Sequence, residues 1–385
     1  MLENTPIVCF ANDFDSDPTS KTHIMRILAR SNPILWVNSI GMRRPTASVG
    51  DVRRMVSKLR RSLGGCSQAG PNLLVANPLA IPFPGVVLAD RLNAEILAAW
   101  LRSLCRRHHR DRPVLWTFLP TVARLLGRLR ERLVIYHCVD EYSEFTGVAR
   151  ETLRRMEEEV VRRADLVIAS SERLRDERRL LNPNSHFVSH GVDLEHFARA
   201  LDRGTQVPED VRRLPRPVIG FFGLLEDWVD LELIRDLALS RPQWSFALLG
   251  KGVTSLSPLQ GVGNVHLLGR KPYAELPGYC RGFDVGIIPF RLNALTARAN
   301  PLKLREYLAA GLPVVSTPLP EVSRYASLVR MAQGEEAFVA GIEQCLEERS
   351  ETLARRRVEA MRAESWEARV ADISALIDRR LGEAA

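Results

Sequence analysis

Lys303 and Glu306 are the residues whose types and spacing most clearly predict chemistry in this sequence. They lie three residues apart in segment 299–317, ANPLKLREYLAAGLPVVST, which has the pattern of a helix followed by a strand. On a helix this spacing places both side chains on one face. The lysine and the free N–H groups of the helix start can hold phosphates, while the carboxylate can accept hydrogen bonds from a ribose diol. The pair therefore predicts a nucleotide-diphosphate site, although a surface ion pair would show the same spacing.

Residues with known preferences mark both ends of this helix. Asn300 is expected to cap the N-terminus, with Pro301 in the first helical position. Gly311 can adopt the left-handed conformation that ends a helix, and Pro313 prevents the helix from continuing. Lys303 then falls in the first turn, where the helix dipole disfavours a cation. An anion docked at the helix start would explain that placement.

The segment NPLKLREYLAAGLPVVST resembles the nucleotide-sugar-binding motif of the GT-B glycosyltransferases, especially the large family 4-like retaining group. The resemblance implies that Glu306 binds the donor ribose, and that Leu302, Lys303 and the helix start hold the diphosphate. Four further segments extend the likeness over about residues 134–315: HGVDLEHF, PVIGFFG, FALLGKG and VHLLGRKPYAELPGYCRGFDVGIIPF. The first hundred residues resemble the family less, as expected of a half that binds varied acceptors.

Other residues of the second half complete the expected donor site. Gly223 and Gly250 each follow a predicted strand and would let a ligand approach the backbone. The family's usual first glutamate would fall at position 298, which is Arg298 here. The usual Arg and Lys after the first donor-domain strand are also absent. Arg270, Arg298 and Lys303 are therefore the candidate cations for the diphosphate, with Asn300 beside them at the helix start.

Short β-branched runs alternate with helical patterns along the whole chain. This alternation is typical of parallel sheets covered by helices, so we expect an α/β protein. The predicted strands are 6–11, 34–38, 72–76, 114–118, 133–138, 166–170, 186–189, 218–222, 245–249, 265–267, 285–289 and 313–316. The resemblance implies the GT-B fold, with two Rossmann-like, doubly wound parallel-sheet domains facing a cleft.

The Pro-rich and charged segment 201–217 predicts a linker between these domains. It would separate an acceptor-binding domain, residues 1–200, from a nucleotide-sugar-binding domain, residues 218–364. A final helix is expected over 365–385, where it would pack against other helices or back on the N-terminal domain.

The first half offers candidates for the acceptor side of the reaction. Asp140 follows the predicted strand 133–138, and loops after parallel strands line the ligand crevice of such sheets. Related enzymes carry a His-Asp pair near this place, so we expect Asp140 to contact the acceptor or to act as its base. Capping of the following loop is the alternative. Asn12 and Asp13 follow the first strand, where they would bind the acceptor or form an ordinary turn, and His137 is expected to pack at its strand end.

A basic amphipathic helix is predicted over residues 51–63, DVRRMVSKLRRSL. Its apolar residues share one face, and five basic residues crowd the rest: Arg53, Arg54, Lys58, Arg60 and Arg61. Such helices lie on anionic membranes, so we expect a peripheral membrane contact; a core-packing helix is the alternative. The chain's whole net charge of +8 arises within its first 200 residues, which agrees with an anionic partner there. We expect no nucleic-acid binding, because no basic groove with interleaved aromatic residues is visible.

Composition places the chain among ordinary globular proteins, with 45% hydrophobic and 26% charged residues. The 6 cysteines are scattered without a CxxC pair, so reduced thiols in a cytosolic protein are expected. The first residues resemble no signal peptide, and no apolar run is long enough to span a membrane. We therefore expect a cytoplasmic protein at the inner face of the plasma membrane.

Taken together, these features predict a hexosyltransferase-type glycosyltransferase. It would move a sugar from a nucleotide-diphosphate sugar to a lipid-linked or oligosaccharide acceptor in exopolysaccharide or envelope glycan synthesis, with retention of configuration. No metal or other cofactor is expected, since Lys303 and the helix dipole can neutralise the phosphates. Three alternatives stay open: an inverting transferase with Asp140 as base, a sugar-nucleotide epimerase on the same fold, and a catalytically degenerate, membrane-associated binding subunit.

Overall fold

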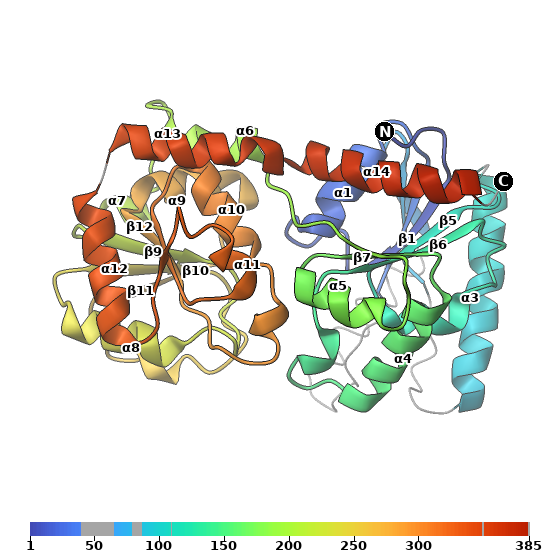
Figure 1. The fold of residues 1–385 in the computed structure, drawn as a ribbon, viewed down its shortest axis with the longest axis horizontal. Coiled ribbons are helices and arrows are strands. Elements are labelled where there is room, and N and C mark those ends of the chain that lie inside the picture. Colours follow the sequence, from blue (N-terminus) through green and yellow to red (C-terminus); the bar gives the residue numbers. More distant parts are fainter. Residues whose placement is uncertain (40–64, 79–86, 109, 349, 384–385) are drawn as a thin grey trace. The chain divides into compact units, whose positions relative to one another are not determined.

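The computed structural model describes residues 1–39, 65–78, 87–108, 110–348 and 350–383 (Figure 1). The chain forms two compact units, one of Met1–Ser189 with Arg369–Ala385 and one of His190–Ala368. The boundary thus falls before the segment 201–217 that was expected to be a linker. That segment belongs to the second unit because its short helix α7 (Glu209–Arg212) packs there, with Val211 only 2% exposed.

The first unit is built on a single sheet with strand order β3-β4-β2-β1-β5-β6-β7-β8. All neighbouring strands are parallel except β3 and β4. The strands are β1 (Ile7–Ala11), β2 (Ile34–Asn38), β3 (Cys66–Gly70), β4 (Leu73–Ala76), β5 (Val114–Thr117), β6 (Leu133–Cys138), β7 (Leu166–Ala169) and β8 (Ser185–Phe187). The chain builds outward from β1 in one direction and then, from β5, in the other. The carboxyl ends of β1 and β5 are therefore the switch point at which such sheets bind ligands.

Helices connect these strands (Figure 1). Their apolar side chains pack in the core of the unit. The helices are α1 (Ser20–Leu28), α3 (Val87–Arg107), α4 (Arg150–Arg163) and α5 (Glu172–Arg179). The last helix, α14 (Trp366–Glu383), begins in the second unit and belongs to the first unit from Arg369 onward. Its apolar residues Val370, Ile373 and Ile377 are buried, as their helical spacing predicts.

The second unit has an all-parallel sheet with strand order β11-β10-β9-β12-β13-β14. Its strands are β9 (Val218–Phe222), β10 (Ser245–Leu249), β11 (Val265–Gly269), β12 (Val285–Ile288), β13 (Val314–Ser316) and β14 (Arg330–Met331). Its helices are α6 (Leu194–Ala198), α7, α8 (Leu231–Ser240), α9 (Leu276–Gly282), α10 (Leu302–Ala309), α11 (Pro320–Ser323), α12 (Glu335–Glu347) and α13 (Glu351–Ala360). Here the switch point lies at the carboxyl ends of β9 and β12. Two doubly wound parallel-sheet units confirm the predicted α/β fold class.

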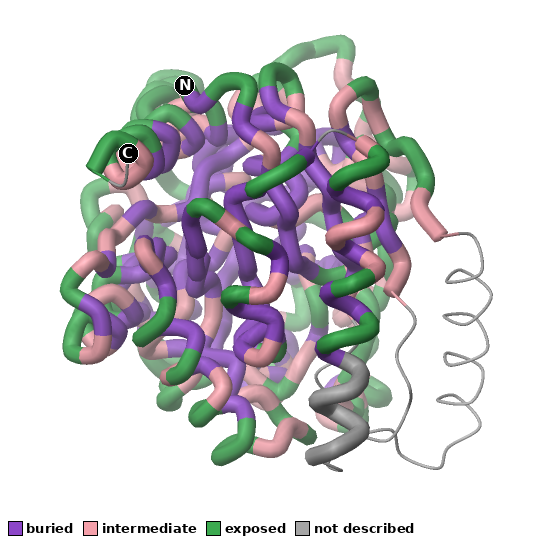
Figure 2. Tube along the Cα trace, turned by 90° about the vertical axis from the view of Figure 1, so that its right-hand side faces the viewer, coloured by how far each residue is buried: buried purple, intermediate pink, exposed green. Residues whose placement is uncertain are grey.

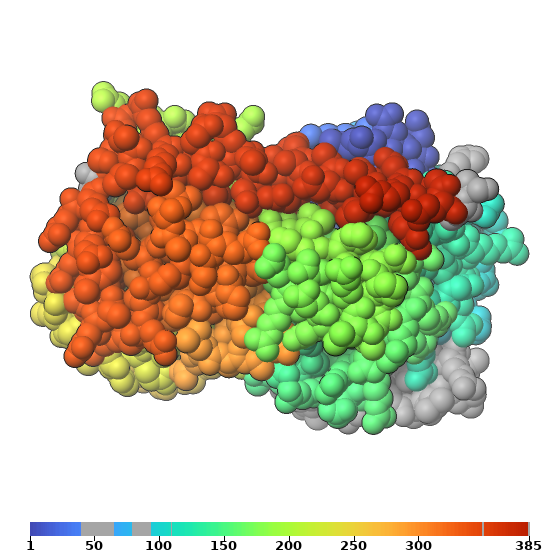
Figure 3. Space-filling model, in the orientation of Figure 1, coloured from blue at the N-terminus to red at the C-terminus, as the bar shows by residue number. Residues whose placement is uncertain are grey.

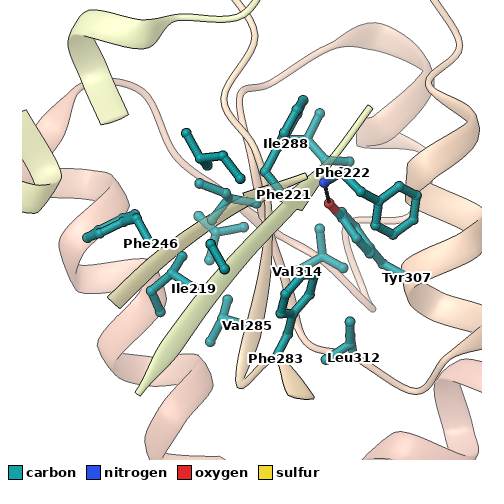
Figure 4. Close-up of a cluster of buried hydrophobic side chains, with 14 of the residues drawn as sticks. Ile219, Phe221, Phe222, Phe246, Phe283, Val285, Ile288, Tyr307, Leu312 and Val314 are labelled. Atoms are coloured by element: carbon teal, nitrogen blue, oxygen red, sulfur yellow. Dashed lines mark hydrogen bonds between the residues drawn. The ribbon is translucent and has the colours of Figure 1, made fainter. Parts of the chain in front are cut away.

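The strands form the buried interior of the molecule, which Figure 2 shows in purple. In the second unit the core includes Phe221, Phe246 and Phe283, each almost fully buried (Figure 4). Gly220 leaves room for this packing, because a Cβ there would lie 2.0 Å from the Phe283 ring. The helix α13, by contrast, has no buried residue and lies at the surface, as Figure 3 shows in orange-red.

Candidate active site

The helix α10 begins at Leu302, one residue later than the sequence predicts. Pro301 has an extended backbone (φ −65°, ψ 119°) and occupies the capping position, so Asn300 lies outside the helix. The prediction that Asn300 caps α10 is therefore wrong. Its side chain is buried, and its Oδ1 accepts a hydrogen bond from Arg305 Nη1 at 2.7 Å. At the other end, Gly311 (φ +75°) terminates the helix as predicted.

Arg305 holds the start of α10 in place from inside the unit, where it is 1% exposed. Besides Asn300, its guanidinium donates through Nε to Glu364 Oε2 (2.9 Å) and through Nη2 to Tyr325 OH (2.8 Å). The three contacts come from the turn before α10, the segment before α14 and the residues after α11. A planar guanidinium can satisfy partners in three directions at once, which a lysine cannot do.

Tyr307 fixes α10 against the sheet. Its phenol oxygen accepts a hydrogen bond from the Phe222 N–H at 3.1 Å, and the two rings meet edge to face at 4.8 Å (Figure 4). Gly286 on β12 allows this approach, because a Cβ there would lie 3.0 Å from the Tyr307 ring. The start of α10 is thereby held beside the carboxyl end of β9.

Lys303, in the first turn of α10, is half-buried among aromatic side chains. Its Nζ lies 5.1 Å from the centre of the Phe221 ring and 4.7 Å from that of Phe290. Burial lowers the pKa of Lys303 from 10.5 to about 8, and the Glu306 carboxylate opposes this shift. Partly desolvated charges interact strongly with a ligand of opposite sign. Lys303 is therefore well placed to bind a phosphate.

Glu306 lies one turn along α10 and is half-buried as well. Burial raises its pKa from 4.5 to about 7, while Lys303 lowers it. The charge of Glu306 in turn helps to raise the pKa of the nearby Tyr273 phenol, after burial, which is the larger cause. Tyr273 stacks on His196 with ring centres 4.5 Å apart. An aromatic pair therefore stands close to the predicted ribose-binding carboxylate.

Gly223 and Gly250 form the turns that face Lys303. Both have positive φ, +135° and +148° respectively, a conformation that glycine adopts readily. A Cβ at Gly250 would lie 1.8 Å from the Gly223 carbonyl oxygen, and one at Gly223 would lie 3.2 Å from Lys303 Cε. The structure thus brings Gly223, Gly250, Lys303 and Glu306 into one small region, and only glycine fits its two turns.

The remaining donor-site candidates lie around this group or apart from it. Leu302 is the first residue of α10 and is half-buried. Arg298 lies in a short 3-10 helix before α10, and its Nη1 donates to the Ala294 carbonyl at 2.7 Å. Arg270 is exposed just after β11. Lys303, by contrast, lies directly beside the turn at Gly223.

The first unit contains a second polar group, centred on Lys21 in the first turn of α1. Lys21 is 6% exposed, and its Nζ donates to Asn12 Oδ1 (2.9 Å) and Tyr142 OH (3.1 Å). Asn12 follows β1 and Tyr142 follows β6. Asp140 lies within range of the Lys21 charge: burial raises the pKa of Asp140 from 3.8 to about 6, and Lys21 opposes the rise. Burial lowers the pKa of Lys21 to about 8, opposed mainly by Asp140.

The loop that carries Asp140 is fixed by a buried ion-pair network. Arg178 of α5 donates through Nη2 to Glu141 Oε2 and to Glu157 Oε1, both at 2.8 Å. Ser143 Oγ donates to Glu141 Oε1, and Tyr136 OH donates to Glu157 Oε1, each at 2.6 Å. Glu141 is thus occupied by structural contacts.

The other candidate residues of the first unit, His137 and Asp13, make contacts that stabilise the fold. His137 is buried and stacked against Phe118 with ring centres 4.8 Å apart; burial and then Lys21 lower its pKa to about 3. It therefore packs at the strand end, as predicted. The Asp13 carbonyl accepts hydrogen bonds from the backbone N–H (3.2 Å) and Oγ (2.6 Å) of Ser16, which is the geometry of an ordinary turn.

The sequence analysis did not identify three residues that belong to the Lys303 region or to the Lys21 group: Lys21, Tyr142 and Arg305. Lys21 carries the signal that identified Lys303, since it is a lysine in the first turn of a helix after a predicted strand. Tyr142 gives no such signal, because Lys21 is 121 residues away. Arg305 gives none either, because its partners Tyr325 and Glu364 are 20 and 59 residues away.

Some predicted features lie outside these groups. Arg53, Arg54, Lys58, Arg60 and Arg61 fall in the segment 40–64, outside the described residues. In the part of the chain that is described, no helix is long and apolar enough to cross a membrane. The same residues contain no group of three or more His, Cys, Asp or Glu that could hold a metal ion.

Comparison with known proteins identifies the family to which the chain belongs. Residues 216–348, which contain the Lys303–Glu306 region, match the family described as Glycosyl transferases group 1. The chain belongs to this family and is a glycosyltransferase, as the resemblance implied.

The chain is similar to a bacterial relative and to solved structures. TuaH of Bacillus subtilis (strain 168), whose name places it in teichuronic acid biosynthesis as a glycosyltransferase, is 30% identical over 281 residues, 66% of this chain and 69% of TuaH. A sucrose-phosphate synthase from Thermosynechococcus elongatus aligns with TM-score 0.69 and 16% identity, over 99% of this chain and 100% of that one. HepE of Anabaena, in complex with UDP and glucose, aligns with TM-score 0.66 and 15% identity, over 97% of this chain and 100% of HepE. These likenesses identify the fold as GT-B.

Proposed function

We propose that this enzyme transfers a sugar from a nucleoside-diphosphate sugar to a saccharide acceptor in the synthesis of an envelope or exported polysaccharide. The observation that carries the proposal is the grouping of Lys303 and Glu306 with the two glycine turns at the carboxyl end of β9. The name of TuaH supports the polysaccharide context.

In this proposal each part of the donor site has a separate task. The N–H groups at the start of α10 and the Lys303 ammonium bind the diphosphate and stabilise the negative charge that grows on it as it leaves. Glu306 accepts hydrogen bonds from the ribose diol. Gly223 and Gly250 let the diphosphate approach the backbone. Arg298 and Arg270 supply further positive charge if their side chains turn toward the bound donor.

Titration calorimetry with UDP, GDP, ADP and their glucose conjugates tests the donor site. We expect saturable binding of one base, weakened in Glu306→Ala by about 1–3 kcal/mol, the scale of a hydrogen bond to a charged group. Glu347→Ala, an exposed carboxylate at the end of α12, is the matched control and should bind normally. Unchanged affinity in Glu306→Ala would remove the ribose role. Repeating the titrations with EDTA tests whether the diphosphate is bound without a metal ion.

The acceptor side is assigned to the first unit. Asn12 and Asp140 would meet the acceptor, and Asp13 would shape the adjoining turn. Burial raises the pKa of Asp140 to about 6, which suits the base of the inverting alternative, whereas the family resemblance implies retention. The anomeric configuration of the product, read by NMR, decides between them. Turnover without an acceptor would instead indicate an epimerase, and binding without turnover a degenerate subunit.

We also propose a cytoplasmic enzyme that binds peripherally to the anionic inner face of the plasma membrane, where a lipid-linked acceptor would be found. The support is the basic amphipathic sequence 51–63. Charge reversal at Arg53, Arg54 and Arg60 should release the protein from vesicles containing phosphatidylglycerol and leave donor affinity unchanged. Equal vesicle binding by the variant would contradict this part of the proposal.

A further inference from the structure

Three asparagines stand at the carboxyl ends of three neighbouring strands in the first unit. Asn12 follows β1, Asn38 is the last residue of β2 and Asn77 follows β4, and these strands have the order β4-β2-β1 in the sheet. The register pairs Asn38 with Ala11, the residue before Asn12. We call the three asparagines the amide row. Ligands of parallel sheets bind at this edge, which is also where the acceptor is proposed to bind.

The hydrogen bonds of Asn38 fix the orientation of the Asn77 amide. Asn38 is 7% exposed, and its Oδ1 accepts hydrogen bonds from the Phe14 N–H and from Trp36 Nε1, both at 2.9 Å. Those two groups can only donate, so Asn38 turns its oxygen toward them and its amide nitrogen away from them. The nitrogen donates to Asn77 Oδ1 at 2.7 Å. The half-exposed Asn77 therefore turns its oxygen toward Asn38 and its two N–H donors away from it.

Lys21 fixes the Asn12 amide in the same way. Its ammonium group, which can only donate, is bonded to Asn12 Oδ1 at 2.9 Å, so the nitrogen of this exposed amide faces away from the lysine. The ammonium group also donates to the Tyr142 OH at 3.1 Å. A positive charge at the carbonyl end polarises the amide and strengthens its N–H groups as donors. Both ends of the amide row thus offer donors, while the protein occupies their oxygens.

A surface of this kind selects a ligand atom that only accepts hydrogen bonds. The oxygens of a carboxylate and of an acetamido carbonyl are such atoms, whereas a hydroxyl group also brings a proton that needs an acceptor of its own. We propose that Asn12 and Asn77 bind a carbonyl-type oxygen of the saccharide acceptor, so that the enzyme selects an acceptor sugar carrying an N-acetyl group or a carboxylate. Asn38 is a positioning residue of this site. The inference rests on the proposed transfer to a saccharide acceptor.

The charges beside the amide row favour the acetamido group of the two. Asp13, Asp15 and Asp17 follow Asn12 in the same loop, and Asp15 and Asp17 are exposed. Their negative charges outnumber the ammonium group of Lys21 and disfavour a carboxylate. An acetamido oxygen gains the same hydrogen bonds without this repulsion.

Saturation-transfer NMR with simple methyl glycosides tests this specificity without a donor. The probes are the gluco and galacto forms of the methyl hexoside, the methyl hexuronoside and the methyl 2-acetamido hexoside. We expect an acetamido sugar or a uronoside to bind the full-length wild type about tenfold more tightly than the plain hexoside, the scale of one hydrogen bond. Affinity that falls with added salt would identify the carboxylate as the bound group, and affinity independent of salt the acetamido carbonyl.

Two variants remove the donors and leave the internal contacts in place. Asn12→Asp and Asn77→Asp keep the oxygen that accepts from Lys21 or Asn38 and replace the outward N–H groups by a second oxygen, so both should lose the preference. Gln68→Glu, on the exposed strand β3, makes the same change of charge and should keep it. The thermal midpoint of each variant confirms that it is folded.

The positioning role of Asn38 has a spectroscopic signature of its own. In Asn38→Asp the second oxygen accepts where the amide donated, so the Asn77 amide should turn over. The side-chain ¹⁵N–H signals of Asn77 should then shift, and the preference for the acetamido sugar or the uronoside should be lost. A contact that only stabilises the fold would move the thermal midpoint and leave the preference unchanged.

Several results would overturn the inference. They are equal affinity for all probes, no binding of any probe at about 20 mM, and an unaltered preference in both Asn12→Asp and Asn77→Asp. Weaker UDP binding by these variants with unaltered glycoside binding would assign the amide row to the donor instead. Sugar transfer without any preference among the probes would disprove only this inference, whereas a preference without transfer would disprove only the proposed function.

Discussion

Arg305 Nη1 donates a hydrogen bond to Asn300 Oδ1 at 2.7 Å, across the start of the helix that carries Lys303 and Glu306. The same guanidinium binds Glu364 and Tyr325, so a single buried side chain joins three segments that are distant in sequence. The start of α10, where we propose that the diphosphate binds, is therefore held by a side chain that is buried inside the unit. Several measurable consequences arise from this and from the neighbouring contacts.

Replacing Arg305 should weaken both the fold and the donor site. Arg305→Met removes the guanidinium that Glu364, Asn300 and Tyr325 bind, which costs about 3 kcal/mol for a buried ion pair broken on one side. Urea unfolding should show this loss, and calorimetry should show weaker nucleotide binding at temperatures where the variant is folded. Arg355→Met is the matched control, because Arg355 is 74% exposed in its pair with Glu351 and such pairs contribute about 1 kcal/mol or less. Equal destabilisation of both variants would refute this role of Arg305.

Donor affinity should depend on pH through Lys303 and Glu306. Below about pH 7 Glu306 gains a proton and loses its capacity to accept two hydrogen bonds, and above about pH 8 Lys303 loses its charge. Affinity for UDP-glucose, if UDP is the base bound, should thus be greatest between these values and fall by up to about tenfold per pH unit above pH 8. Lys303→Arg should keep its affinity at pH 9, because arginine stays protonated. A flat profile in the wild type would show that Lys303 does not bind the diphosphate.

The turn at Gly250 should tolerate no side chain. A Cβ would lie 1.8 Å from the Gly223 carbonyl oxygen, and φ is +148°. Gly250→Ala must therefore move one of the two turns, at a cost of at least about 2 kcal/mol in the free energy of unfolding. At the exposed Gly263 a Cβ meets nothing within 4 Å, so Gly263→Ala should be close to neutral. Thermal melts of the two variants compare them directly.

Arg178 should be essential to the first unit. It pairs with Glu141 and Glu157 at 2.8 Å in the interior, so Arg178→Met removes the positive charge that faces two buried carboxylates. We expect a loss of about 3–5 kcal/mol in the free energy of unfolding. Arg173→Met removes an exposed arginine that pairs with Glu177 on the same helix and should change stability by less than about 1 kcal/mol. If chemical denaturation shows equal stability for the two, the network is not what fixes the Asp140 loop.

The sequence predicts the sheets well because buried parallel strands have a strong local signal. All twelve expected strands occur, and their bounds differ from the observed ones by two residues at most. Two observed strands were not expected. β3 reads CSQAG, lies at the edge of its sheet and is largely exposed, so it lacks the apolar run that identifies a buried strand. β14 has only 2 residues.

The candidate site was predictable only where its residues are close in sequence. Lys303 and Glu306 share one turn of a helix, so their spacing revealed them. Other contacts of the two polar groups join residues that are far apart in the sequence: Arg305 meets Glu364 across 59 residues, and in the first unit Lys21 meets Tyr142 across 121. Tertiary hydrogen bonds of this kind leave no periodic pattern in the sequence. The assignment of Asn300 failed for a local reason, because the guanidinium of Arg305, on the helix that Asn300 was expected to cap, takes its amide oxygen.

Most of α14 belongs to the first unit, which affects when this unit can fold during synthesis. The first unit includes Arg369–Ala385, and the buried side chains of Val370, Ile373 and Ile377 belong to it. Although the last strand of its sheet ends at Phe187, this unit cannot bury all of its apolar surface until Val370, Ile373 and Ile377 have left the ribosome. A nascent chain therefore carries an unfinished amino-terminal half throughout synthesis of the other half. Truncation before residue 369 would therefore damage the unit whose other residues, Met1–Ser189, are made first.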